Sequence, residues 1–303
     1  MKTKDWLAFA GLSLAWGSSF FWIKIAVQEV GPFLLVALRV LFGILGLLVV
    51  LGFNRPKGGL DRRAWQTLLI LGITNTAAPF VLISWAEQHI DSAVAAILNS
   101  SMPLFTLVIA HFTVADDKMN LQKTLGVLVG FLGVVVLSAR DLGGDLRMNF
   151  LAQLAMLGAV LFYAGSTVFA RRNTQNISPV VRALVPLLSA DAVIWAGALW
   201  LEAPVRLPAT ALTWGALLWL GIIGSCVAYL LYYYLLHSVG PTRISMVTYM
   251  FPVVGVVLGV LILKERLDFP LIAGATLVLA SLVIVNRRLG VAPVTASQSG
   301  AAK

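Results

Sequence analysis

Two prolines stand inside long apolar runs of this sequence, and polar residues precede each of them. Asn99 lies one turn before Pro103, and Tyr249 lies just before Pro252. Because proline has no N–H to donate, it frees a backbone carbonyl one turn earlier, where that carbonyl can face a cavity and bind a ligand. Either proline alone could merely bend a packed helix. Their matching placement favours a hinge or site role for both.

Aromatic rings, amides and hydroxyls inside the apolar runs complete the set of side chains that could recognise a small molecule. Aromatic rings stack on aromatic ligands and attract amino groups through cation–π interactions, although they are also ordinary packing material in membrane helices. An uncompensated amide in hydrocarbon costs several kcal/mol, so it must face protein or a water-filled cavity. The candidate substrate-binding residues are Trp16, Phe20, Asn75, Pro79, Asn99, Tyr163, Ser166, Tyr229 and Tyr249.

Four charged residues lie within or close to the apolar runs, and one of them, Arg171, is expected to extend to the membrane interface from the end of its run. Arg39 is about eight residues into its run, and an arginine at such depth costs about 2.5 to 3.5 kcal/mol even on the lenient insertion scale. It therefore needs a partner, which is either a protein carbonyl or carboxylate or the carboxylate of a substrate. Asp191 is the one clearly embedded acid, and it serves either in proton coupling or in a structural hydrogen bond. Lys24 lies near the end of its run, where its ammonium is expected to extend to the membrane interface.

Few residues of this chain could support catalysis or hold a metal. Cys226 is the single cysteine, the three histidines form no HExxH sequence, and no Walker A sequence occurs. We therefore expect no cofactor, no metal site and no enzymatic activity, and a membrane-embedded enzyme is only a remote alternative. The net charge of +9 comes from short basic tracts between apolar runs, which indicates a membrane topology rather than nucleic-acid binding.

The elements that must position these residues are transmembrane helices. Of the 303 residues, 59% are hydrophobic and only 12% are charged, whereas soluble domains carry about 25% charged residues. A helix needs about 20 apolar residues to cross the hydrocarbon layer. The fold class is therefore an all-α integral membrane protein in a lipid bilayer. The apolar runs predict ten spans, at residues 5–28, 31–53, 64–86, 91–113, 121–140, 148–171, 180–202, 210–236, 241–263 and 268–287.

The basic residues favour one orientation of these spans. With the N-terminus in the cytoplasm, fifteen Lys and Arg residues fall on the inner side and five on the outer side, as the positive-inside rule requires. Both termini are therefore expected in the cytoplasm. The small, polar tail at residues 291–303 is expected to be disordered. The protein is expected to be a monomer, with a homodimer as the alternative.

The two halves of the sequence resemble each other at an offset of 147 to 149 residues. Leu69–Ile73 recurs as Leu218–Ile222, and Pro103 matches Pro252. We therefore expect one five-helix repeat at residues 1–143 and a second at residues 144–290. Because five is odd, the second copy must be inverted in the membrane, which places a site near the midplane between the repeats. Such halves can open the site to either side in turn, so alternating-access transport is favoured over a static pore.

Short motifs of the chain also resemble a known family. The run from Trp16 to Phe20, followed by Ile23 and Lys24, is similar to the first-helix pattern of EamA-type members of the drug/metabolite transporter superfamily. The segment Gly255–Arg266 and the glycine-bearing tenth span are similar to the same family. The resemblance covers essentially the whole chain and implies a ten-helix transporter.

Within that family the chain most resembles the YddG-type exporters of aromatic and other amino acids. The resemblance implies a multi-pass exporter in a bacterial inner membrane, with amino acids, especially aromatic ones, as the favoured cargo. Drugs, nucleosides or cationic metabolites are the alternative cargoes, and export is either proton-coupled or facilitated. In one departure from the family pattern, Asp116 stands in the first repeat opposite Glu265, at a place where glutamate is commoner.

Overall fold

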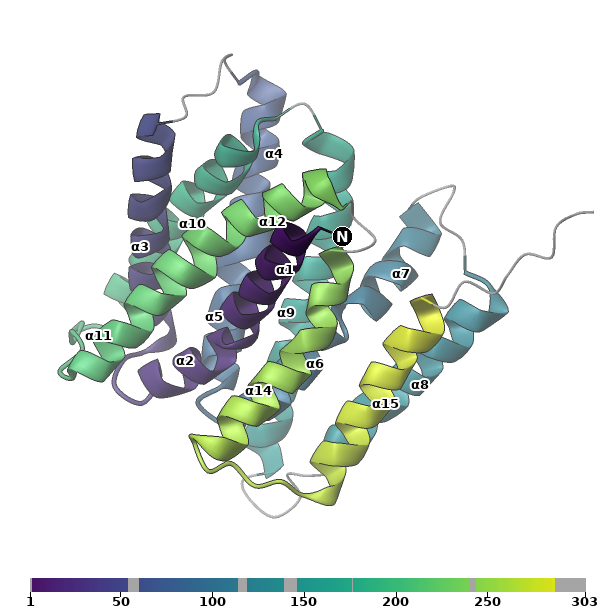
Figure 1. The fold of residues 1–303 in the computed structure, drawn as a ribbon. Coiled ribbons are helices and arrows are strands. Elements are labelled where there is room, and N and C mark those ends of the chain that lie inside the picture. The colour runs from purple at the N-terminus through teal and green to yellow at the C-terminus, as the bar shows by residue number, and fades with distance from the viewer. Residues whose placement is uncertain are drawn as a thin grey trace, which may run out of the picture.

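The computed structural model describes residues 2–53, 60–113, 119–138, 146–175, 177–239 and 244–286. All regular secondary structure within these ranges is helical (Figure 1). Eight helical segments are long and apolar enough to cross a membrane, and the shorter apolar helices Met246–Leu261 and Phe269–Val285 bring the number to ten. The predicted all-α membrane fold is therefore confirmed. The predicted tail at residues 291–303 and Asp116 lie outside the described residues.

The ten spans follow the predicted ranges to within a few residues, and several consist of more than one helix. The first five are α1 (Thr3–Gly17) with α2 (Ser19–Ala26), α3 (Pro32–Phe53), α4 (Arg62–Gly72) with η1 (Ile73–Ala77) and α5 (Ala78–Ala86), α6 (Ser92–Ser100) with α7 (Met102–Thr113), and α8 (Leu121–Ser138). The second five are α9 (Leu146–Asn173), α10 (Pro179–Leu201), α11 (Ala211–Leu218) with η3 (Trp219–Val227) and α12 (Ala228–Ser238), η4 (Ser245–Tyr249) with α14 (Met250–Leu261), and α15 (Phe269–Asn286).

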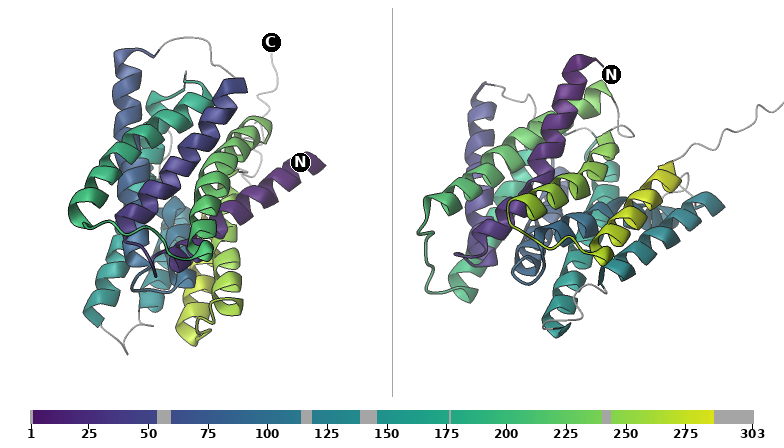
Figure 2. Two further views of the ribbon diagram at one scale, coloured as in Figure 1. Left: turned by 90° about the vertical axis from the view of Figure 1, so that its left-hand side faces the viewer. Right: turned by 60° about the horizontal axis from the view of Figure 1, so that its bottom comes forward.

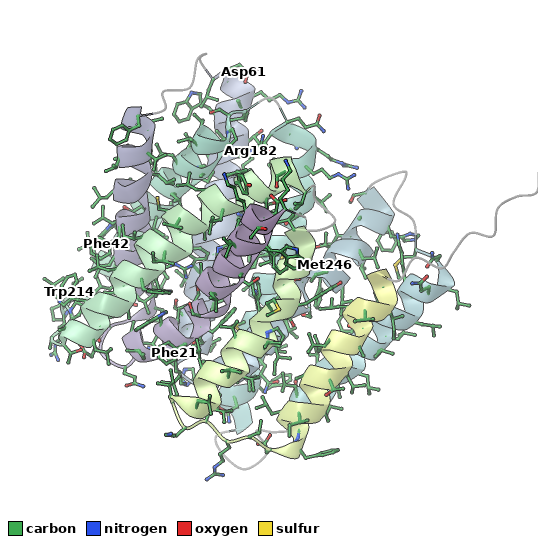
Figure 3. The ribbon with its side chains drawn as sticks, in the orientation of Figure 1. Phe21, Phe42, Asp61, Arg182, Trp214 and Met246 are labelled. Atoms are coloured by element: carbon green, nitrogen blue, oxygen red, sulfur yellow. The ribbon has the colours of Figure 1, made fainter. Side chains whose placement is uncertain are left out.

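Large apolar side chains cover the outside of the helix bundle. Trp6, Leu128 and Trp200 are among the exposed ones, and Figure 3 shows carbon-rich side chains projecting from the outer helices. In the same view Asp61, which precedes α4, lies at the top, and Trp214, near the start of α11, lies at the left edge. Soluble monomers rarely expose so large an apolar surface, whereas lipid chains solvate it. The surface therefore fits a protein that spans a membrane.

Two spans contain a π-helical segment at matching places in the two repeats, η1 in the third span and η3 in the eighth. In η3 the Ser225 hydroxyl donates to the Leu220 carbonyl at 3.1 Å. In η1 the Thr74 hydroxyl donates to the Ile70 carbonyl at 2.9 Å. Short hydroxyl side chains thus satisfy carbonyls near the widened turns. π-Helical turns often mark functional sites, so both segments are candidates for the parts that bind or move.

Each predicted hinge proline stands in the first turn of a new helix. Pro103 is the second residue of α7, after the break at Ser101, and Pro252 is the third residue of α14, after the 3₁₀ turn η4. The N–H groups of a first helical turn have no intrahelical partner, so proline costs little there. At the first break the Ser101 N–H and hydroxyl both donate to the Leu98 carbonyl, at 3.1 and 2.6 Å. Both spans are therefore divided just before their prolines.

The helix contacts within the bundle occur in matching pairs across the two repeats. α8 packs on α15, α3 on α10 and α6 on α14, so equivalent spans meet. The contact of α5 with α9 is matched by that of α12 with α1, and the contact of α3 with η3 by that of α10 with α4. The views of Figures 1 and 2 agree in placing α8 and α15 side by side at one edge. Exchanging the repeats thus leaves the packing scheme unchanged.

Glycines allow α8 and α15 to approach closely. A Cβ on Gly133 would lie 2.9 Å from the Leu277 Cβ and 3.0 Å from the Gly274 carbonyl oxygen, and a Cβ on Gly274 would lie 3.0 Å from the Gly133 carbonyl oxygen. Each glycine therefore faces the backbone of the other helix. Gly126 and Gly130 face the same partner helix within this chain, so the small-residue stripe of α8 serves internal packing.

Replacing Gly133 with alanine is expected to lower the stability of the protein. The new methyl group meets backbone atoms that cannot turn away, and overpacking of this kind costs about 1 to 3 kcal/mol. Thermal unfolding of the detergent-solubilised protein measures the change. Gly215→Ala in α11 is the matched control, because no heavy atom lies within 4 Å of its new methyl group and alanine favours the helix. Equal melting temperatures for the two variants would contradict the assigned packing.

Two glutamates of the second repeat cap helices of the first repeat at the lower end of the bundle in Figure 1. Glu202 accepts hydrogen bonds from two N–H groups in the first turn of α3, at 2.8 and 2.9 Å. Glu265 accepts from the first two N–H groups of α6, at 2.7 and 3.0 Å. A carboxylate at a helix N-terminus satisfies free N–H groups and complements the helix dipole. These caps tie the two repeats together at this end.

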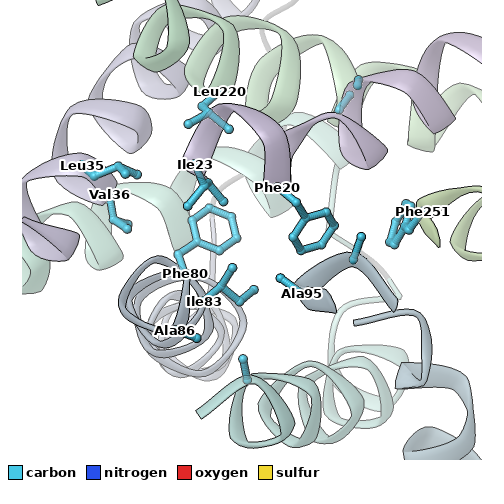
Figure 4. Close-up of a cluster of buried hydrophobic side chains, with 14 of the residues drawn as sticks. Phe20, Ile23, Leu35, Val36, Phe80, Ile83, Ala86, Ala95, Leu220 and Phe251 are labelled. Atoms are coloured by element: carbon cyan, nitrogen blue, oxygen red, sulfur yellow. The ribbon is translucent and has the colours of Figure 1, made fainter. Parts of the chain in front are cut away.

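The central core also contains residues of both repeats (Figure 4). Phe20 of α2, Phe80 and Ile83 of α5, Ala95 of α6 and Phe251 of α14 are all buried in one apolar cluster. Three of the candidate substrate-binding residues, Trp16, Tyr163 and Tyr229, pack against this cluster.

Candidate functional site

Trp16 lies at the break between α1 and α2, where it contacts the π-helical segment of the second repeat. Its indole N–H donates to the Gly224 carbonyl at 3.1 Å. A second hydrogen bond has its donor in the second repeat: the Trp219 indole N–H donates to the Ser18 hydroxyl at 3.1 Å. Two indoles therefore hold the broken first span against η3, and both hydrogen bonds join irregular parts of the helices.

Trp16 is also the centre of an aromatic cluster. The centroid of its ring lies 6.3 Å from that of Tyr229, 5.7 Å from that of Tyr232 and 6.5 Å from that of Phe251. The Phe20 and Phe251 centroids are 6.3 Å apart and their ring planes are tilted by 57°, and Figure 4 shows the two rings as neighbours. These separations lie in the range of favourable aromatic pairing. The structure thus brings together three of the predicted residues, Trp16, Phe20 and Tyr229.

Arg39 lies next to this cluster. Its guanidinium carbon is 4.0 Å from the centroid of the Phe80 ring, a cation–π contact. Tyr163 of α9 and Tyr229 of α12 lie within electrostatic range of its charge. Because Tyr229 also contacts the Trp16 ring, the arginine and the aromatic cluster form one site.

The Arg39 guanidinium has no bonded counter-charge in the described part of the protein, although the Glu87 carboxyl lies within electrostatic range. Its side chain is only 5% exposed, and its Nε is buried with no acceptor. Among the residues that the structure describes, no hydrogen bond or ion pair to the guanidinium is found. A buried cation is costly unless it is paired. The site therefore holds an unmatched positive charge beside aromatic rings, an arrangement that can bind an anion with an apolar part.

The predicted amides lie on elements around this site. Asn99 is buried in the last turn of α6, and its side-chain oxygen has no hydrogen-bond partner in the described ranges. Asn75 is half-buried in η1, and Pro79 is buried at the start of α5. α6 and α5 both contribute to the core cluster under the aromatic rings. No hydrogen bond joins these three residues to Arg39 or Trp16 in the part of the chain that the structure describes, so their role stays a prediction.

Ser166 lies in a separate groove between α4, η1 and α9. Its hydroxyl donates to that of Thr74 at 2.9 Å. The groove has a volume of about 530 Å³. Its lining is Ile70, Thr74, Gly158, Leu161, Phe162, Gly165, Ser166 and Phe169, so the Thr74–Ser166 pair is the main polar feature. Ser166 is therefore not brought to Arg39 by this structure.

Tyr249 and Asp191 also lie apart from the aromatic cluster. The Tyr249 hydroxyl donates to the Leu282 carbonyl of α15 at 3.1 Å, and its ring packs against a small second core that includes Leu104. Asp191 is half-buried midway along α10, beside Trp195. In the described ranges, no hydrogen bond or ring contact joins Trp16 or Arg39 to either residue.

Several residues of the site were missed at the level of sequence. Tyr232 follows Tyr229 by three residues, a spacing that puts both on one helix face, and Phe251 directly precedes Pro252, so both carried a detectable signal. Phe80 carried none, because aromatic residues are common in apolar runs. Glu87 was also missed, because it follows the third span directly and yet is completely buried. Helices that pack over a span end can bury a charge that the sequence places at the membrane interface.

Metal chemistry has no basis in the described ranges. No group of three or more His, Cys, Asp or Glu side chains there could hold a metal ion. The site consists of aromatic rings, one guanidinium and backbone carbonyls, which bind ligands but supply neither a nucleophile nor a general base.

Comparison with known families and proteins accounts for nearly the whole chain. The model of the family described as "EamA-like transporter family" matches residues 4–139 and again residues 150–287. The two matches correspond to the two sets of five spans.

The relatives match this chain over most of their own length. "Uncharacterized transporter YoaV" of Bacillus subtilis is 23% identical over 91% of this chain and 94% of its own length. An "Uncharacterized transporter" of Archaeoglobus fulgidus is 26% identical over 94% of this chain and 99% of its own length. "Uncharacterized inner membrane transporter YedA" of Escherichia coli K12 is 26% identical over 83% of this chain and 80% of its own length. A solved structure aligns with a TM-score of 0.67 at 19% identity, over 94% of this chain and 98% of that chain, which concerns the fold alone.

Proposed function

The chain belongs to the EamA-like transporter family, and we propose that it exports small amphipathic metabolites, with aromatic amino acids as the favoured cargo. That it is a multi-pass membrane transporter and not an enzyme follows from the family and from relatives that are named as transporters. The name of the Escherichia coli relative supports a bacterial inner membrane as the location. The motif resemblance to YddG-type exporters supports the aromatic cargo.

The observation that carries the cargo proposal is the unmatched Arg39 beside the Trp16 cluster. A carboxylate on the guanidinium would form charge-assisted hydrogen bonds, which are about twice as strong as neutral ones. An aromatic side chain on the same ligand could then pack against Trp16 and Tyr229, which lie 6.3 Å apart. The Gly224 carbonyl is already occupied by the Trp16 N–H. A ligand with a carboxylate at one end and an apolar ring at the other uses both features.

Alternating access between two inverted repeats is the mechanism we favour. Two observations support it: the helix contacts match across the repeats, and the spans are interrupted at matching places, by η1 and η3 and before Pro103 and Pro252. Inverted repeats of this kind place a substrate site between the halves and let each half open in turn. The orientation with both termini in the cytoplasm rests on the distribution of basic residues. The partners in this scheme are the substrate and the bilayer, and the monomer is sufficient.

Counterflow in liposomes tests the function. Purified protein is reconstituted into vesicles loaded with unlabelled phenylalanine, and the uptake of labelled phenylalanine is followed. The proposal expects saturable uptake above that of empty vesicles, competed by tyrosine and tryptophan. If no amino acid showed counterflow, the proposal that amino acids are the cargo would be refuted. Competition by adenosine or by a quaternary amine instead would favour the alternative cargoes, and non-saturable flux would indicate a pore.

A further inference from the structure

Glu87 is a buried acid that the proposed substrate site does not use. It follows directly after α5 and is 0% exposed. Both of its carboxyl oxygens are buried and lack a hydrogen-bond partner among the described residues. A carboxylate in such surroundings would lose its hydration without any compensation, so the neutral, protonated acid is strongly favoured. Burial thus favours the neutral form of this carboxyl group at the helix end.

The charged groups around Glu87 come from three other elements. Lys24 of α2, Arg39 of α3 and Glu265, after α14, are the charges that act on it. Lys24 and Arg39 favour the ionised form and Glu265 opposes it, whereas α9 and η1, which also pack on α5, bring no charge to it in the described ranges. Burial outweighs these charges and raises the pKa of the Glu87 carboxyl well above its ordinary value.

The nearest cation does not bind the Glu87 carboxyl group. The Lys24 ammonium donates instead to the backbone carbonyls of Glu87 and Ile90, at 2.7 and 2.8 Å. The ammonium thus holds the turn between the third and fourth spans. This arrangement favours a neutral Glu87, because a carboxylate would compete with the two carbonyls for the ammonium.

The same turn is held from its other side by Glu265. Its carboxylate accepts hydrogen bonds from the Ser92 N–H and hydroxyl, both at 2.7 Å, and from the Ala93 N–H at 3.0 Å. Lys264, with a φ of 61°, turns the chain toward this contact, and a side chain on Gly259 would collide with the Glu265 carboxylate. Residues 87–93 are thus clasped by a cation on their carbonyls and an anion on their N–H groups.

We propose that Glu87 is a proton-binding site linked to the opening of this clasped turn. With the turn closed, Glu87 holds a proton. When the turn separates from α2 and the α14 end, water reaches the carboxyl, one proton leaves for the solution, and the carboxylate that remains attracts the Lys24 ammonium away from the carbonyls. Opening therefore releases one proton and is favoured by a higher pH. The role of this site in transport rests on the proposed function, but the binding of a proton by Glu87 can be tested without transport.

The first test measures phenylalanine counterflow with the same pH on both sides of the vesicles. If opening of the turn limits exchange, the rate in the wild type rises with pH, by at most about tenfold per pH unit for one released proton. In Glu87→Gln, a neutral side chain of nearly the same shape, the rate stays at its acidic value at every pH. A Glu87→Gln protein whose rate still rises with pH would overturn the inference, as would loss of the pH response in Asp191→Asn instead.

Glu29→Gln is the matched control. Glu29 lies at the same end of the bundle but is exposed, and hydrogen bonds from Thr210, then from Ala209, hold the pKa of its carboxyl below the ordinary value. Glu29 is therefore already ionised at every pH above the ordinary pKa of glutamate. The counterflow rate of Glu29→Gln should then rise with pH as it does in the wild type. If Glu29→Gln flattened the response as Glu87→Gln does, the assignment to Glu87 would be wrong.

The second test is the pH dependence of thermal unfolding in detergent. The folded chain holds the Glu87 proton and the unfolded chain releases it, so stability falls as pH rises above the ordinary pKa of glutamate. The melting temperature of the wild type should therefore fall more between about pH 5 and about pH 8 than that of Glu87→Gln. Parallel curves for the two proteins would overturn the inference. Absence of any amino-acid counterflow would instead refute the proposed function, while this measurement would still decide the state of Glu87.

Discussion

Replacing Arg39 with glutamine is expected to reduce amino-acid counterflow by about thirtyfold or more. The loss corresponds to about 2 kcal/mol or more, the amount that removal of one partner from a buried charge pair typically costs. The arginine is 5% exposed and has no protein partner in the described ranges, so a bound carboxylate is the group that would lose its counter-charge. Counterflow of phenylalanine in liposomes, at several concentrations, measures the effect and should show it mainly as weaker binding.

The thermal stability of the Arg39→Gln variant distinguishes a substrate-binding role from a structural one. If the guanidinium supported the fold, its removal would lower the melting temperature. Because it is an unpaired buried cation, its replacement by the neutral amide is expected to leave the melting temperature unchanged or to raise it. Arg39→Lys keeps the charge but loses the planar fork, so counterflow should be intermediate. Unchanged counterflow in Arg39→Gln, or a large loss of stability with it, would contradict the substrate role.

Much of the fold could be predicted because it depends on local patterns. Apolar runs of about 20 residues identify spans, and the recurrence of Pro103 as Pro252 identifies the duplication. The π-helical segments could not be predicted, since hydroxyl groups such as those of Thr74 and Ser225 also occur in ordinary helices. Whether a turn widens depends on the packing of neighbouring helices.

The site was only partly predictable, because its contacts join distant parts of the chain. Trp16 and Gly224 are 208 residues apart, and no local pattern reports their hydrogen bond. Tyr249 illustrates the opposite case. Its place before Pro252 suggested the site, but its hydroxyl donates to the Leu282 carbonyl of α15. A residue next to a helix break can point to either side, and the sequence does not fix which.

Glu87 shows why burial of charge is the hardest feature to foresee. An acid directly after an apolar run normally lies at the membrane interface. Here Lys24 from α2 and Glu265 from the segment after α14 close over the turn, and the acid is left beneath them. The burial is a property of three segments together, so none of them carries it in its own sequence.

Replacing Trp16 with alanine is the second large effect we expect, a loss of amino-acid transport of about thirtyfold. Truncation of a central aromatic anchor typically costs about 2 kcal/mol or more. Here it removes the ring contacts with Tyr229, Tyr232 and Phe251 and the hydrogen bond to the Gly224 carbonyl. The measurement is labelled phenylalanine counterflow at matched amounts of reconstituted protein.

Trp16→Phe separates the two parts of this effect. It keeps an aromatic face for the substrate but leaves the Gly224 carbonyl without its donor, which costs about 1 to 3 kcal/mol when the group is buried. Transport should therefore fall less than in Trp16→Ala, while the melting temperature falls in both. Trp200→Ala is the control, because its side chain is 85% exposed on the outside of the bundle and touches no part of the site. If Trp16→Ala transported as fast as Trp200→Ala, the aromatic cluster would hold helices together but would not contact the substrate.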